Sequence, residues 1–166
     1  MKKFLILPIM LTAASCGSND EIASGTFDDG EGGKGSYSIS GDNDDSETVI
    51  KSGDGEVRIA TGSKAVTDLP MGIKLYPGAN IQSSMTGMGD GKSGAVIVFE
   101  SSDDQDDVIS FYKDQMKAKG IEVQTEVKSG DMQMIAGQGP DGEGINISVV
   151  KDDDVVTATL MVGEDN

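Results

Sequence analysis

One amphipathic helix, predicted over residues 103–119, constrains the fold of this chain more than any other segment. Its apolar residues recur every three or four positions and would form a stripe along one side. The stripe consists of Val108, Ile109, Phe111, Tyr112 and Met116. Ser102 with Gln105 predicts a capping box at its start, and Gly120 predicts its end. Because such a stripe must be covered, the helix predicts a layer of sheet beneath it.

Alternating segments on both sides of the helix would supply that sheet. Residues 95–99 are apolar and predict a buried strand before the helix. After it, four segments separated by short turns predict antiparallel strands. These segments are residues 121–127, 132–136, 145–150 and 155–162. The predicted fold is α+β, with one main helix packed on an antiparallel sheet of about four to five strands. Met132 and Met134 would share the strand face beneath the helix.

Two segments of different composition precede the expected main domain. Residues 16–35 are rich in Gly, Ser, Asp and Glu, which predicts a disordered, charged tether. Residues 36–66 predict short strands, with a hairpin turn at 52–55 between two apolar alternations. The main domain is then expected over residues 67–163.

The first sixteen residues predict where the protein is located. Two lysines precede an apolar run over residues 4–11, and small residues lead to Cys16, the sole cysteine of the chain. This layout predicts a secretory signal peptide over residues 1–15. The apolar run is far shorter than the ~20 residues needed to span a bilayer. With one cysteine, the chain cannot form an internal disulfide.

Residues 13–16, Ala-Ala-Ser-Cys, resemble the lipobox of bacterial lipoproteins. In that family the cysteine thiol takes a diacylglycerol, the leader is cut, and the new amino terminus is acylated, for example with palmitate. The resemblance implies that Cys16 is the lipidation site and anchors the protein in the cell envelope. Gly17, where Asp would favour retention in the inner membrane, implies the periplasmic face of the outer membrane. The alternative is a plain secretory leader followed by an incidental cysteine.

A second resemblance covers residues 69–162. The Tyr-Pro-Gly-Ala segment at 76–79, the strand ending at Phe99, Phe-Tyr-Lys at 111–113 and Gly120 follow one another in the chain. The series is similar to that of a group of uncharacterised bacterial lipoproteins and periplasmic proteins. This resemblance implies no activity and no catalytic residues. Phe111 and Tyr112 are expected to be core aromatics.

Charge and composition exclude several classes of function. The formal net charge is −16, and an acidic surface of this kind repels nucleic acid. The chain has no histidine, which removes the commonest general base and the commonest metal ligand. Matches to phosphate-binding patterns at 87–93 and 137–142 lie between expected strands, where the helix that such a loop requires is missing. We therefore expect no catalytic, metal or cofactor-binding residues.

The resulting expectation is a lipid-anchored, non-enzymatic binding or interaction module of the envelope. Its partner would be the membrane, through the lipid, together with an unknown envelope protein or small ligand. One alternative is a weakly calcium-responsive acidic module using the acidic turns at 42–46 and 152–154. Another is a hydrolase of unrecognised type, which would require a deep polar pocket with converging carboxylates.

Overall fold

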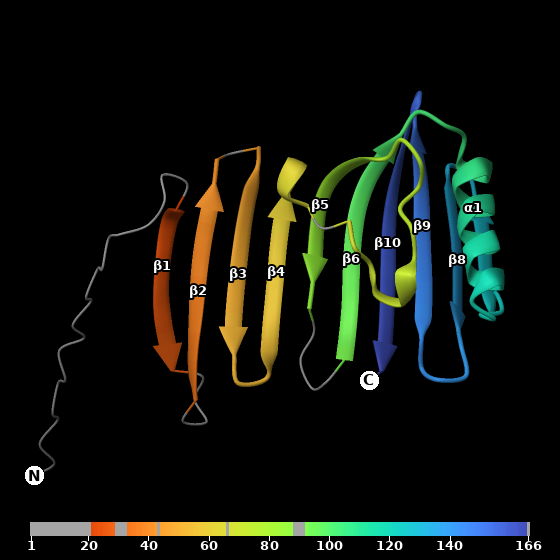
Figure 1. Cartoon of the computed structure of the whole chain (residues 1–166). Coiled ribbons are helices and arrows are strands. Elements are labelled where there is room, and N and C mark those ends of the chain that lie inside the picture. The colour runs from red at the N-terminus through yellow and green to blue at the C-terminus, as the bar shows by residue number, and fades with distance from the viewer. Residues whose placement is uncertain (1–20, 29–32, 43, 66, 88–91, 166) are drawn as a thin grey trace, which may run out of the picture.

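The computed structural model describes residues 21–28, 33–42, 44–65, 67–87 and 92–165. Within these residues the chain forms one ten-stranded antiparallel sheet and one α-helix (Figure 1). The strands are β1 Glu21–Asp28, β2 Lys34–Gly41, β3 Ser46–Ser52, β4 Gly55–Thr61, β5 Asn80–Thr86, β6 Lys92–Ser101, β7 Thr125–Ser129, β8 Met132–Gln138, β9 Gly144–Asp152 and β10 Val155–Asp165. The helices are α1 Gln105–Ala118 and two short 3-10 turns, η1 Gly62–Lys64 and η2 Pro70–Gly72.

The order of the strands differs from the chain order at one place only. Strands β1 to β6 lie side by side in sequence order, followed by β10, β9, β8 and β7. Helix α1 carries the chain from β6 to the far edge at β7, and three hairpin connections then bring it back. The last strand, β10, therefore closes the gap between β6 and β9 and joins the two halves of the sheet.

The predicted α+β fold, with four to five strands and a disordered N-terminal tether, is wrong. The sheet has twice that number of strands, and β1 and the first residues of β2 fall inside the segment expected to be the tether. That segment has few apolar residues. A strand that adds to an existing sheet edge nevertheless gains a full ladder of backbone hydrogen bonds, and these do not require apolar side chains. Cys16 and the predicted leader lie outside the described residues.

Two aromatic residues compensate for glycines in these outer strands. Gly25 of β1 is paired with Tyr37 of β2, and Gly35 of β2 is paired with Phe27 of β1. Each ring lies over the glycine opposite, so that a side chain at either glycine would collide with it. Covering a glycine with a cross-strand aromatic restores the packing that the missing side chain cannot provide.

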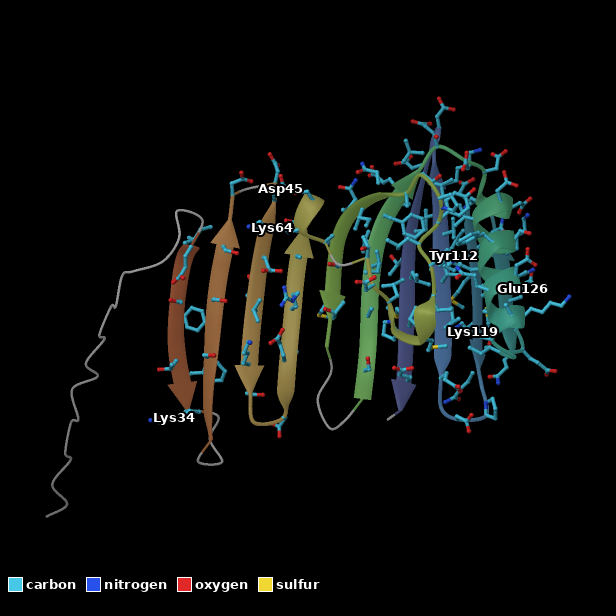
Figure 2. All side chains as sticks on the ribbon, viewed as in Figure 1. Lys34, Asp45, Lys64, Tyr112, Lys119 and Glu126 are labelled. Carbon is cyan, nitrogen blue, oxygen red and sulfur yellow. The ribbon has the colours of Figure 1, made fainter. Side chains whose placement is uncertain are left out.

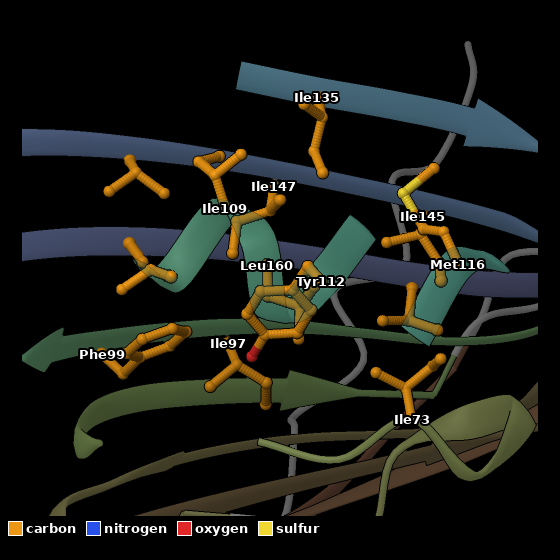
Figure 3. Close-up of a cluster of buried hydrophobic side chains, with 14 of the residues drawn as sticks. Ile73, Ile97, Phe99, Ile109, Tyr112, Met116, Ile135, Ile145, Ile147 and Leu160 are labelled. Atoms are coloured by element: carbon orange, nitrogen blue, oxygen red, sulfur yellow. The ribbon is translucent and has the colours of Figure 1, made fainter. Parts of the chain in front are cut away.

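The core lies on one face of the C-terminal half of the sheet. Helix α1 packs on β8 and β9, while η2 and the segment after it pack on β6 and β10. Figure 3 shows Ile97, Ile147 and Leu160 directed at Tyr112 of the helix. All four side chains are fully buried. The expectation that Tyr112 is a core aromatic is confirmed, and Phe111 packs on the core while remaining partly exposed.

The ends of α1 agree only in part with the sequence prediction. The helix begins at Gln105 after Asp104, whose side chain makes no cap hydrogen bond. The predicted capping box is wrong, because the Gln105 amide instead donates to the backbone carbonyl oxygens of Asp131 and Val149. At the other end, Gly120 has a φ of 73°. The Ile121 N–H donates to the carbonyl of Met116, which closes the helix as a Schellman motif.

The Tyr-Pro-Gly-Ala segment forms a turn that fastens the core. Ala79 N–H donates to the Tyr76 carbonyl at 3.1 Å, and Gly78 has the positive φ of 76° that this turn requires. The Tyr76 ring meets Phe111 edge to face at 5.3 Å. Its backbone N–H donates to the Tyr112 hydroxyl at 3.2 Å, and its own hydroxyl donates to Asp103 at 2.8 Å. The turn thus fixes the segment before β5 to the helix.

Candidate functional site

The face of the sheet opposite α1, here called the open face, is the side on which neither α1 nor η2 packs. Because side chains alternate along a strand, the pairing register assigns each residue to one face. Buried side chains such as Ile97, Ile147 and Leu160 mark the helix side, so their neighbours in sequence lie on the open face. Met132 and Met134 also lie on the open face, because the residues that follow each of them, Gln133 and Ile135, are the buried ones. The prediction that the two methionines pack beneath the helix is wrong.

The open face is almost free of charge. Among the strand side chains that the structure describes, only Glu100 and Asp152 are charged on this face, and both lie at strand ends. Charged residues of the same strands point to the helix side, as Glu47, Lys51 and Arg58 do. In a chain with a formal charge of −16, this separation makes the open face chemically distinct from the rest of the surface.

A trough of about 400 Å³ lies on the open face. It crosses the adjacent strands β6, β10, β9 and β8 and reaches the start of β7 at the edge. Its lining contains no charged side chain. The lining residues are Ala95, Val96, Gln124, Thr125, Ala136, Gly137, Gln138, Gly144, Ile145, Asn146, Met161, Val162 and Gly163.

A row of glycines contributes to the hollow. Gly163 of β10 is paired with Gly94 of β6 on one side and with Gly144 of β9 on the other. A Cβ at Gly163 or Gly144 would meet its nearest neighbour at 3.8 or 3.9 Å, which is ordinary van der Waals contact. Neither of these two glycines is therefore needed for a close backbone approach. Because these glycines have no side chains to project into the trough, they make it deeper.

A few amide and hydroxyl groups stand among the apolar walls. Asn146 lies on the same face of β9 as Gly144, next to Met161 in the pairing. Gln138 ends β8, and its carbonyl oxygen accepts a hydrogen bond from the Gln124 amide at 3.2 Å. The trough can thus make hydrogen bonds at its margin while offering an apolar floor.

A second cluster, near the start of α1, is polar and has a structural role. Asp106 accepts from Lys128 Nζ at 2.8 Å and from Gln133 Nε2 at 2.6 Å. These hydrogen bonds hold the pKa of Asp106 below its usual range, with the Lys128 contact the larger cause. They also satisfy Gln133, which is buried beneath the helix. The cluster fixes α1 to β7 and β8.

The acidic turn at 42–46, considered for calcium, uses carboxylates to order the backbone. Asp42 Oδ1 accepts from the N–H groups of Asp44 and Asp45. Asp45 in turn accepts from the Ser63 N–H, which lowers the pKa of its carboxyl. The described part of the chain contains no group of three or more acidic or cysteine side chains placed to hold a metal ion. Cys16, the predicted lipidation site, lies outside it.

The sequence prediction missed the trough, although a signal was present. Gly94, Gly144 and Gly163 each stand at the end of an alternating apolar segment. Their juxtaposition depends on β10 pairing with both β6 and β9, which no local pattern indicates.

The fold and site together define an antiparallel sheet covered by a helix on one side and carrying an apolar trough on the other. The profile of a family described as START domain-like matches residues 81–155, from β5 to the start of β10. This match supports a ligand-binding module. No curated protein and no solved structure matches the chain. None of the described helices is long and apolar enough to cross a membrane.

Proposed function

We propose that this chain is a lipid-anchored, non-enzymatic binding module of the bacterial cell envelope, which holds an uncharged, largely apolar ligand in the trough. The observation that carries the proposal is the trough itself. It is a hollow of about 400 Å³ with a glycine-lined floor, on a face nearly free of charge in a strongly acidic protein.

The size and lining of the trough indicate the class of ligand. Its volume falls within the range of about 300–1,000 Å³ typical of small-molecule sites. Val96, Ala136 and Met161 offer apolar contact, and each methylene buried there would contribute about 0.8 kcal/mol. A charged group would be desolvated without an opposite charge to pair with, which disfavours it. Asn146 and Gln138 at the margin could bind one polar group of the ligand.

The same lining supports a binding role over a hydrolytic one. The walls carry neither a carboxylate nor a lysine, and the chain has no histidine. General acid–base catalysis needs a titratable group within hydrogen-bond reach of the substrate. A ligand seated in this trough would meet amides, a hydroxyl and aliphatic carbons.

The anchor rests on the lipobox-like segment that ends at Cys16. Two or more acyl chains give stable membrane attachment, where one gives marginal binding. We expect the wild-type chain to sediment with membranes and the Cys16→Ser variant to be released. A Cys16→Ser variant that still sediments with membranes would contradict the lipoprotein assignment and leave the trough proposal intact.

Ligand binding can be tested with a neutral fluorescent probe, N-phenyl-1-naphthylamine, added to the full chain carrying Cys16→Ser. We expect fluorescence enhancement with the parent protein. Gly163→Leu and Gly144→Leu should abolish it, because both place an aliphatic side chain in the trough, and the added Cβ meets no atom closer than 3.8 Å.

The matched control is Gly53→Leu, in the turn between β3 and β4, where no atom lies within 4 Å of an added Cβ. It should bind the probe like the parent. Equal enhancement in all four proteins would mean that the probe binds elsewhere. Absence of enhancement in the parent would count against an apolar ligand.

A further inference from the structure

We propose that two copies of this chain associate face to face through the open face of β1–β4. The apolar side chains of that surface, here called the extension face, are Phe27, Tyr37, Ile39, Ile50, Val57 and Ile59. None of strands β1–β4 lines the trough, and the proposal does not depend on the ligand-binding function.

Among the described residues, strands β1–β4 form a single layer and contribute no side chain to the hydrophobic core. The elements that cover the sheet, α1 and η2, pack on β6, β8, β9 and β10, while η1 touches β3 and β5 at one end. Figure 2 shows side chains dense between α1 and the sheet, around Tyr112, and sparse along β1–β4. No described helix therefore packs across either face of this layer.

The two faces of the layer have opposite character. On the helix side, Arg58 bonds to Glu47 at 2.6 Å and to Glu56 at 3.3 Å, and Lys51 bonds to Glu56 at 2.9 Å. These ion pairs suit a face that meets water. The extension face carries no charged strand residue at all among those described, and Phe27, Tyr37 and Ile59 are 39%, 38% and 41% exposed. Clustered exposure of large apolar side chains marks an interaction surface.

The geometry of the extension face suits a second sheet. Tyr37 lies over Gly25 and Phe27 lies over Gly35, so the two aromatic rings fill the gaps left by the glycines. Two sheets pack face to face about 10 Å apart when their inner side chains interlock. An isologous pair would give each single layer the second layer that it lacks.

Charge favours a second copy as the occupant. A basic partner would be attracted to the acidic surfaces of the protein rather than to this uncharged face. A second copy supplies an equally uncharged face and leaves both charged faces directed at solvent. At physiological salt the Debye length is about 8 Å, so the residual repulsion between the two acidic chains is partly screened.

The available area is sufficient for a specific dimer. With strands about 4.8 Å apart and about 3.4 Å per residue, seven residues on each of β1–β4 give roughly 450 Å² per copy. Met85 of β5 continues the face and is 41% exposed. Including β5 brings the projected area to roughly 570 Å² per copy, or about 1,100 Å² for the pair. This exceeds the roughly 1,000 Å² expected of a specific interface, at its weaker end.

Sedimentation velocity on the full chain carrying Cys16→Ser, over a range of protein and salt concentrations, tests the proposal. We expect a concentration-dependent dimer that tightens as salt rises. Ile59→Lys should leave only monomer, and Ile59→Thr should raise the dissociation constant by at least about tenfold, a change of about 1.4 kcal/mol. Thr keeps the β-branched shape while adding a hydroxyl.

The matched control is Ser38→Lys, which places the same charge on β2 but on the helix side. It should dimerise like the parent, and circular dichroism should give the same spectrum for every variant. A parent that stays monomeric at all salt concentrations would overturn the proposal. A dimer that persists in Ile59→Lys would also overturn it, because the contact would then lie elsewhere.

Discussion

Gly137 provides a sharp test of how the two layers of this protein fit together. It lies on the helix side of β8, buried beneath the segment that leaves α1. A Cβ built at this position would lie 2.6 Å from Met116 Cε and 3.0 Å from Ile121 Cγ2, and closer still to the backbone oxygen of Glu122. Met116 can move, but the carbonyl cannot move without shifting the connection between α1 and β7.

The expected cost of Gly137→Ala follows from this geometry. Overpacking a well-packed core costs about 1–3 kcal/mol, and a backbone clash places this change at the upper end. For a chain of this size, 1 kcal/mol corresponds to about 2–4 °C in melting temperature. We therefore expect Gly137→Ala to melt roughly 4–10 °C below the parent, measured by circular dichroism and by urea unfolding.

Gly144→Ala is the matched control for this substitution. Gly144 stands on the neighbouring strand, where a Cβ meets nothing closer than 3.9 Å. The free energy of unfolding of Gly144→Ala should stay within about 0.5 kcal/mol of that of the parent, or rise slightly because alanine reduces the conformational freedom of the unfolded chain. If Gly137→Ala is as stable as Gly144→Ala, the inference that residues 121–122 pack closely on β8 is wrong.

Two further predictions concern pH. The pKa of Asp106 is lowered in the folded state by Lys128 and Gln133, so its contribution to stability is complete above about pH 5 and is lost as pH falls through its folded pKa. The melting temperature should therefore fall less between pH 5 and 3 in Asp106→Asn than in the parent, and parallel curves would contradict the role of this carboxylate. Burial, assisted by the hydrogen bond to Asp103, raises the pKa of Tyr76 to about 12. Its contribution is therefore complete below about pH 10 and is lost as pH rises toward 12. The difference in melting temperature between the parent and Tyr76→Phe should shrink over that range, and a constant difference would refute it.

Local patterns predicted much of the C-terminal half of the sheet. The helix stripe around Tyr112, the terminating Gly120 and the buried strand at 95–99 are present as expected. The turn at 130–131 joins paired strands there, and the predicted turn at 53–54 joins β3 and β4 in the N-terminal half. The strand expected over 121–127 begins only at Thr125, because Ile121 and Glu122 are used to cross over Gly137. These features depend on residues close together in sequence, where periodicity carries the information.

Strand β1 and the start of β2 could not be predicted in the same way. Residues 16–35 predict a tether because they are rich in Gly, Ser, Asp and Glu and have few apolar residues. Only the pairing of β1 with β2 places Tyr37 and Phe27 over the glycines opposite them. Strand formation here depends on an edge already provided by another strand, and that edge is a tertiary property.

By itself, the sequence determined the helix with its apolar stripe, the short turns that impose antiparallel neighbours, and an acidic composition without histidine. Tertiary structure alone decided that β10 inserts between β6 and β9. That insertion places Gly163 beside Gly144, and both glycines line the trough. The tertiary structure also decided that the charged and the uncharged residues of β1–β4 lie on opposite faces of the sheet. The physical reason is register: in a sheet, a shift of one residue exchanges the faces, and the pairing that fixes it joins residues far apart in the chain.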